Sequence, residues 1–396
     1  MDYYSYKAGK TVVYFFIFSL CISFIYAFFW GKYNGDFGDD VQLKPAFLFL
    51  NLIISTIPFL VLLFFYRYFK FKFQSHKIVY VNMYFFEWLI IFLLFWHISI
   101  SIIFGVNKMG ADAYSAPDYF VPIIQIMNRF NPQYIAPLFL LASNNNRKVI
   151  FIIIGLIIFA VVRASLGILF VISLLMFVKH YPQIIHFIKK HILIVLIITI
   201  VILPFSIKTL YNIRSTLRSS EKIKTDGFSS IIINKFMGRL SSFSNSAILI
   251  QEAPYFIINA QYLEDYFFQK TAISVIFSQS YKPKSNPSEI LVKYANPQAE
   301  NSQYMCGTQG ILIMSLYKSS KVFFINIMTY ILMIYFTFYF AKMIKIEYNL
   351  EYALLNMVMF VMSGSPSEYS FFLFTVLLLI FVFALSNSVK ILLHNK

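Results

Sequence analysis

The sequence predicts an all-α polytopic membrane protein with about ten transmembrane helices and one large hydrophilic loop. Three observations predict this class: 59% of the 396 residues are hydrophobic, only 13% are charged, and long apolar runs recur along the chain. A soluble domain carries about 25% charged residues, so this chain cannot cover a surface that faces water.

The apolar runs set the number of predicted spans. A helix needs about 20 apolar residues to cross a hydrocarbon core of about 30 Å. Runs that meet or approach this length lie at residues 11–30, 46–66, 83–104, 191–207, 321–340 and 369–386, and shorter candidates lie near 132–142 and 352–363. The first run lacks a small-residue cleavage site, so we interpret it as a retained span rather than a signal peptide.

Residues 149–178 form an apolar run that contains one charge, Arg163. As one helix this run would be about 45 Å long, which is too long for one upright crossing and short for two. We expect a hairpin of two short helices with Arg163 at its tip, where Ser165 and Gly167 suit a close turn. Each arm would be about 21 Å long, so the tip would stay inside the hydrocarbon core. A charge at that depth usually serves function, although snorkelling or pairing with a neighbouring helix is the alternative.

The charges in the short loops orient this topology. With the hairpin in place, 15 Lys and Arg residues lie on one side of the membrane and four lie in the short loops of the other side. By the positive-inside rule, the first side is cytoplasmic and both termini lie inside. Residues 1–207 then hold helices 1–7 with the short hairpin, residues 208–320 form the large outer segment with amphipathic helices, and residues 321–396 hold helices 8–10.

The outer segment is basic, with 13 Lys and Arg against seven acids from Lys208 to Lys321, so it favours an anionic ligand. A predicted amphipathic helix that begins at Ser229 or Ser230 and ends at Pro254 carries lysine, arginine and serine on its polar face. Arg214 and Arg218 share another helix face, which is either a substrate site or a basic collar against lipid headgroups. The candidate substrate-binding residues are Arg214, Arg218, Lys235, Tyr211 and Tyr304, because arginine and lysine bind phosphate and tyrosine can stack on sugar rings.

The outer segment contains no histidine, which removes the commonest general base from the largest aqueous region. Carboxylates therefore become the acid or base candidates, foremost Glu252 at the end of the amphipathic helix and Glu368 at the start of the last span. Glu368 can also be read as a plain N-terminal helix charge. The aspartates at 36, 39 and 40 fit an acidic turn better than a metal site, and no nucleotide or metal motif occurs. We expect no metal and no cofactor, and the net charge of +16 indicates lipid phosphate rather than nucleic acid.

The pattern resembles the Wzy-type O-antigen polymerase family. The resemblance rests on about ten spans with both ends inside, an apolar hairpin with an arginine at its turn (VVRASLG), one large periplasmic segment with an arginine-serine helix (GRLSSFS), and a glycine pair where that segment ends (GTQG). The paired motif of some members, an arginine eleven residues before a glycine, is not reproduced, so Arg214 and Arg218 fit only loosely.

The resemblance implies a fold like that of the GT-C integral-membrane glycosyltransferases in the bacterial inner membrane. It implies metal-independent transfer of a growing glycan from undecaprenyl diphosphate to the terminal sugar of an incoming lipid-linked repeat unit, at the periplasmic face. Arg163 and Arg239 would grip the donor diphosphate, and a chain-length regulator protein would be a partner. The alternatives are an O-antigen ligase, which would use a histidine in the large loop, and a non-catalytic flippase or assembly partner.

Overall fold

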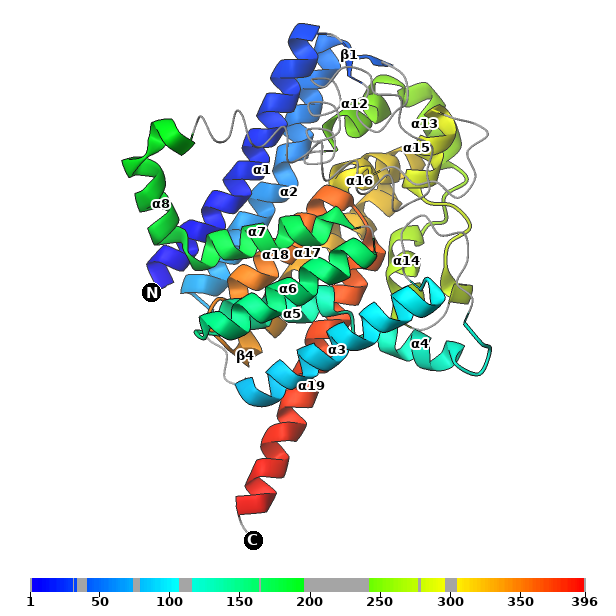
Figure 1. Cartoon of the computed structure of the whole chain (residues 1–396). Coiled ribbons are helices and arrows are strands. Elements are labelled where there is room, and N and C mark those ends of the chain that lie inside the picture. Colours follow the sequence, from blue (N-terminus) through cyan, green and yellow to red (C-terminus); the bar gives the residue numbers. More distant parts are fainter. Residues whose placement is uncertain are drawn as a thin grey trace.

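The computed structural model describes residues 2–30, 32–33, 41–73, 79–106, 116–163, 165–195, 242–276, 279–295 and 305–394. These residues form a helical bundle with two short strand pairs (Figure 1). β1 (Lys32–Tyr33) pairs antiparallel with β2 (Val41–Gln42), and β3 (Val79–Tyr80) pairs parallel with β4 (Ile344–Lys345).

Five long helices within this described part are apolar enough to cross a membrane. They are α1 (Asp2–Trp30), α2 (Pro45–Phe71), α3 (Met83–Phe104), α17 (Ser320–Met343) and α19 (Pro366–His394). A sixth span results if α7 (Leu166–Lys179) and α8 (Tyr181–Lys190), which are bent by 86°, count together. The chain is therefore an all-helical membrane protein. The predicted run 191–207 lies outside the described residues beyond Val195.

Four helices are too short to cross upright. They are α5 (Pro132–Ala142), α6 (Asn146–Val162), α7 and α18 (Asn349–Ser363), which at 1.5 Å per residue are about 16, 25, 21 and 22 Å long. α6 ends at Val162, Arg163 follows it as the C-cap residue, and α7 begins at Leu166, so the apolar run 149–178 is broken at the residue where the sequence predicts the turn.

Each short helix has one end at the same face of the bundle, which we name the basal face. Here Lys179 at the end of α7 donates from Nζ to the carbonyl oxygens of Leu140 (2.6 Å) and Ser143, just before α6 begins. Lys148 forms an ion pair with Glu87, which joins the starts of α6 and α3. Both ends of the α6–α7 hairpin therefore lie on the same face of the molecule.

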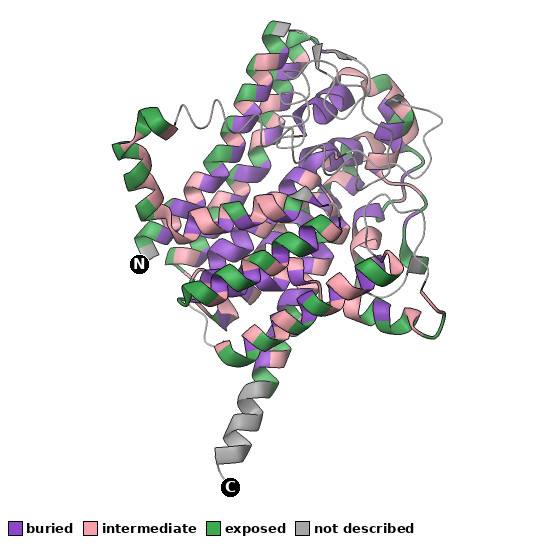
Figure 2. Ribbon diagram, in the orientation of Figure 1, coloured by how far each residue is buried: buried purple, intermediate pink, exposed green. Residues whose placement is uncertain are grey.

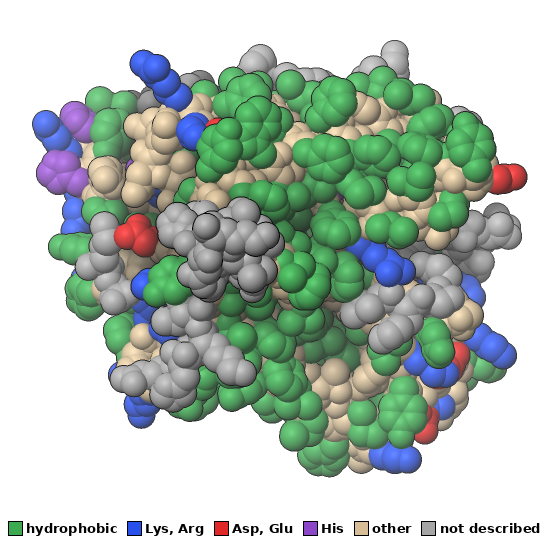
Figure 3. All heavy atoms as spheres, turned by 90° about the horizontal axis from the view of Figure 1, so that it is seen from below, with side chains coloured by type: hydrophobic (Ala, Val, Ile, Leu, Met, Phe, Trp, Pro, Cys, Tyr) green, Lys and Arg blue, Asp and Glu red, His purple; other side chains and the backbone are tan. Residues whose placement is uncertain are grey.

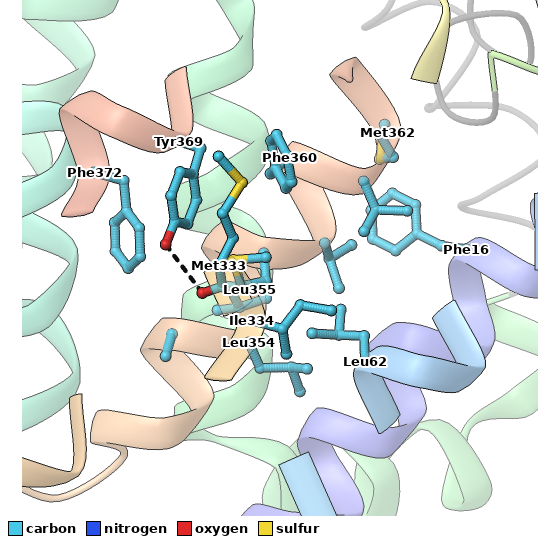
Figure 4. Close-up of a cluster of buried hydrophobic side chains, with 14 of the residues drawn as sticks. Phe16, Leu62, Met333, Ile334, Leu354, Leu355, Phe360, Met362, Tyr369 and Phe372 are labelled. Carbon is cyan, nitrogen blue, oxygen red and sulfur yellow. Dashed lines mark hydrogen bonds between the residues drawn. The ribbon is translucent and has the colours of Figure 1, made fainter. Parts of the chain in front are cut away.

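The core lies where α1, α2, α17, α18 and α19 meet. Figure 4 shows Phe16, Leu62, Ile334 and Leu354 packed together, and all four are fully buried. The Tyr369 hydroxyl donates to the Met333 carbonyl oxygen across 3.0 Å, which satisfies a polar group inside this apolar cluster. α18 is buried over almost its whole length (Figure 2), so it forms the central pillar of the bundle.

The described part of the outer segment adds a layer of helices over the bundle. They are α12 (Phe243–Gln251), α13 (Ala253–Ala260), α14 (Phe267–Ile276), the 3-10 turn η2 (Gln279–Tyr281), α15 (Pro287–Ala295) and α16 (Gly307–Lys318). The short helix α4 (Val121–Asn128) precedes α5.

The described end of the predicted amphipathic helix differs from the prediction. Pro254 was expected to end one helix, but it lies in the first turn of α13, and α12 already ends at Gln251. Residues 243–250 are all buried, so Ser246 does not lie on a solvated face. The reason is that α12 packs between α2 and α16: Asn51 Nδ2 donates to the Phe243 carbonyl oxygen (2.8 Å) from α2.

Candidate functional site

The tips of the short helices bring polar groups together inside the bundle. The α6–α7 turn carries Arg163, the start of α5 carries Tyr134, and the first turn of α19 carries Glu368. The Tyr134 phenol interacts electrostatically with both the Glu368 carboxyl and the Arg163 guanidinium. We name Arg163, Tyr134 and Glu368 the tip cluster.

The tip cluster can be reached by solvent although protein surrounds it. Glu368 is exposed, and Arg163 and Tyr134 are partly exposed. Desolvation by protein is nevertheless the strongest influence on each of the three groups. The tip cluster is therefore exposed at Glu368 and partly covered by protein at Arg163 and Tyr134.

Arg163 is held by the end of its own helix and by an aromatic ring. Its backbone N–H donates to the Phe159 carbonyl oxygen (3.1 Å), and its guanidinium carbon lies 5.1 Å from the centroid of the Phe159 ring. This cation–π geometry favours the charged form and limits the rotamers of a long side chain.

His97 of α3 supports this arrangement from the other side of Phe159. The two rings lie 6.0 Å apart, edge to face. His97 Nε2 lies 3.2 and 3.1 Å from the carbonyl oxygens of Met127 and Phe130, so Nε2 carries the proton and donates to these acceptors. His97 is 1% exposed and its proton is engaged, which makes it a structural histidine rather than a base.

Glu368 is positioned by the serine-rich turn between α18 and α19. The Ser363 hydroxyl donates to the Phe360 carbonyl oxygen (3.5 Å) and accepts from the Ser365 backbone N–H (3.2 Å). The Glu368 backbone N–H donates to Ser365 Oγ (3.4 Å), and Ser365 Oγ lies 2.9 Å from Ser367 Oγ. These bonds fix the start of α19 and aim its first acidic side chain.

A close backbone contact holds this turn against α16. Gly364 has φ +65° and Gly307 has φ +64°. A Cβ atom on Gly364 would lie 2.5 Å from the carbonyl carbon and oxygen of Gly307. Only glycine therefore allows these two backbone segments to approach this closely. Ser242 donates from Oγ to the Met362 carbonyl oxygen (2.8 Å), which adds α12 to the same junction. Parts of GRLSSFS and GTQG therefore meet at the turn that carries Glu368.

The structure brings together two of the predicted site residues, Arg163 and Glu368, through Tyr134. Glu252 lies elsewhere, between α12 and α13, where it accepts a hydrogen bond from Gln251 Nε2 (3.2 Å) and interacts electrostatically with Tyr294. The other predicted site residues lie outside the described ranges; they are Arg214, Arg218, Lys235, Arg239, Tyr211 and Tyr304.

Tyr134, Ser363 and Gly364 belong to the site and were not predicted. Their sequence signals were weak: Tyr134 follows the helix-start pair Asn131-Pro132, and the two others stand in the turn sequence SGSPSE.

Searches for similar proteins gave no match to a family model, to a curated protein or to a solved structure.

Proposed function

We propose that this chain is a membrane glycosyltransferase that polymerises lipid-linked oligosaccharide repeat units, as the O-antigen polymerases do. It would transfer the growing glycan from undecaprenyl diphosphate to the terminal sugar of an incoming lipid-linked repeat unit. The observation that carries the proposal is the tip cluster, in which Tyr134 interacts with both an arginine at the end of the short helix α6 and an accessible carboxylate just after the short helix α18.

The lengths of the helices support a lipid substrate. Helices that start at the basal face and are about 21 to 25 Å long end inside a hydrocarbon core of about 30 Å. The tip cluster would then lie a short distance below the outer edge of the core. A diphosphate that is tethered to a long isoprenoid chain is confined to that edge, within reach of Arg163.

The chemistry assigns a role to each group of the cluster. Arg163 presents a planar fork of donors to the diphosphate oxygens and stabilises the negative charge that grows there as the diphosphate leaves. The acceptor hydroxyl attacks the anomeric carbon of the donor, its proton passes to the Glu368 carboxylate, and the bond from the anomeric carbon to the diphosphate oxygen breaks. Tyr134 interacts electrostatically with both groups.

The finer topology is part of this proposal. It includes about ten spans, a GT-C-like arrangement, both termini in the cytoplasm, and an active site that faces the periplasm of a bacterial inner membrane. Support comes from the hairpin, whose two ends meet at the basal face. Arg239 would complete the diphosphate site, Arg214, Arg218, Lys235, Tyr211 and Tyr304 would bind the glycan or its phosphates, and a chain-length regulator would be the protein partner.

Deletion of the gene tests the function in the bacterium that encodes it. A polymerase predicts surface lipopolysaccharide with at most one repeat unit per molecule, measured as the ladder on a gel. Long polymer that accumulates on the lipid carrier and does not reach the surface would indicate a ligase. Loss of all repeats from the outer side of the inner membrane would indicate a flippase, and an unchanged ladder would exclude all three.

A further inference from the structure

The helix α8 stands apart from the rest of the bundle. It follows α7 with a bend of 86°, and none of its residues is buried. Figure 1 shows it at the edge of the molecule, beside the N-terminal end of α1. α7 packs against α6, so the bend turns α8 away from the α6–α7 hairpin.

α8 has two chemically different faces. Ile184, Ile185 and Ile188 share one side of the helix and are partly exposed, while Gln183, His186 and Lys190 share the exposed side together with Phe187. Lys189 flanks the polar side, and both lysines are exposed in the last turn. A short helix with an isoleucine face and a basic face is typical of one that lies in a bilayer interface.

The stretch of sequence around α8 is uniformly basic. Residues 119–220 contain ten Lys and Arg and no Asp or Glu, so the stretch on either side of α8 offers the lysines no acidic partner. Lysine and histidine side chains gather at one edge of the surface in Figure 3. Within the described residues, His186 of α8 is exposed, and His180 and His191 at its two ends are partly exposed.

Tyr181 at the start of α8 contacts both α1 and α7. Tyr181 OH lies 3.2 Å from Thr11 Oγ1, and the Tyr181 ring lies edge to face with the Phe177 ring at 5.5 Å. Lys7 of α1 interacts electrostatically with Tyr181, so the basic surface of α8 continues onto the first turns of α1. The start of α8 is therefore held in place by contacts of an aromatic residue.

We propose that α8 is a binding platform for anionic phospholipids in the membrane leaflet at the basal face. Its isoleucine face enters the boundary of the acyl chains, and Lys189 and Lys190, with Lys7 nearby, bind the headgroup phosphates. Recognition is by charge, so the ligand class is any phospholipid with a net negative headgroup. This site lies at the opposite end of the α6–α7 hairpin from the tip cluster, and it does not depend on the proposed function.

The test uses the full-length protein in nanodiscs of phosphatidylcholine alone and of phosphatidylcholine with 30% phosphatidylglycerol. Hydrogen–deuterium exchange of residues 180–191 should be slower in the anionic discs, and high salt should remove the difference by screening. In the K189Q/K190Q variant the difference should disappear. Phosphatidylglycerol that is retained after detergent exchange should fall roughly fivefold for each lysine removed.

The variant K282Q/K284Q is the matched control, because it loses the same charge from the outer segment. It should keep the lipid-dependent protection of residues 180–191. Equal exchange in both kinds of disc would overturn the proposal, and so would protection in neutral discs by added glycerol phosphate, which would indicate a site for a free phosphate. A loss of protection in the control variant as large as in K189Q/K190Q would also overturn it.

Discussion

Arg163 is the residue on which the proposed chemistry depends most. Its guanidinium is partly exposed at the tip of a short hairpin and lies against the Phe159 ring. We predict that Arg163→Ala lowers polymerisation by roughly 100-fold or more, because one positioned donor to a developing anion contributes about that much. Arg163→Lys should restore only part of the activity, since lysine keeps the charge and loses the fork.

Polymerisation of lipid-linked repeats by purified protein measures both variants. Arg147→Ala is the control, because Arg147 is an exposed arginine at the basal face, at the other end of the same helix. Full activity in Arg163→Ala would remove Arg163 from the site.

Glu368 is predicted to act on the acceptor rather than on the donor. Glu368→Gln keeps the shape of the side chain, so we expect a fall in turnover of roughly 100-fold or more with unchanged binding of the lipid diphosphate. Asp265→Asn, an exposed acid in the outer segment, should change neither quantity. If donor binding fell as much as turnover, Glu368 would be a structural residue.

The charged members of the tip cluster could be predicted because a charge in an apolar run is conspicuous. Tyr134 and Ser363 could not, since tyrosine and serine are common at helix ends and their roles arise only when α5 and α18 meet. Glu252 was predicted on the same ground as Glu368, but it lies between α12 and α13 and takes no part in the cluster.

At the scale of elements, a buried ion pair fastens α18 to α2. Lys70 Nζ lies 2.8 Å from Glu351 Oε1, with side chains 7% and 0% exposed, and the Tyr66 hydroxyl donates to the same oxygen across 2.7 Å. Glu351→Ala would leave the Lys70 charge buried opposite an apolar side chain. We predict a loss of about 3–5 kcal/mol in the free energy of unfolding, measured in detergent.

The double variant Lys70→Met/Glu351→Leu is the control for Glu351→Ala, because it removes both charges and keeps the side-chain volumes similar. It should recover most of the lost stability. A Glu351→Ala protein as stable as the unmodified chain would show that the pair does not fasten α18.

The contact of α16 with the α18–α19 turn makes a second prediction. Gly364→Ala adds a methyl group 2.5 Å from the Gly307 backbone at a positive φ, so it should cost at least about 1–2 kcal/mol and displace Glu368. We expect a lower melting temperature together with reduced polymerisation. Gly167→Ala meets no atom within 4 Å and should preserve both; equal behaviour of the two variants would argue against a functional contact.

The sequence predicted the long spanning helices better than the helices of the outer segment, and the difference has a physical reason. Apolar runs predicted α1, α2, α3, α17 and α19 because length alone identifies a spanning helix. The break at Arg163 followed from a helix that was too long for one crossing. The buried state of α12 was missed, because periodicity shows which residues share a face but not whether a second layer covers the polar one.

At the scale of the whole molecule, short helices from one face create a polar site at depth. The spanning helices α1, α2 and α17 form a frame, and α5, α6, α7 and α18 stop short inside it. In the proposed topology, this arrangement would place the tip cluster below the membrane edge without an unpaired backbone in lipid. The proposed function therefore requires that the basal face lies on a single side of the membrane.

Cysteine labelling in right-side-out spheroplasts tests this claim most directly. Single cysteines would replace Arg147, Gln183 or Lys282 in a chain without Cys21 and Cys306; these three positions are exposed and flank the hairpin or mark the outer segment. The account predicts that an impermeant maleimide labels position 282 in intact spheroplasts and labels positions 147 and 183 only after permeabilisation. Labelling of 147 and 183 from opposite sides would contradict it.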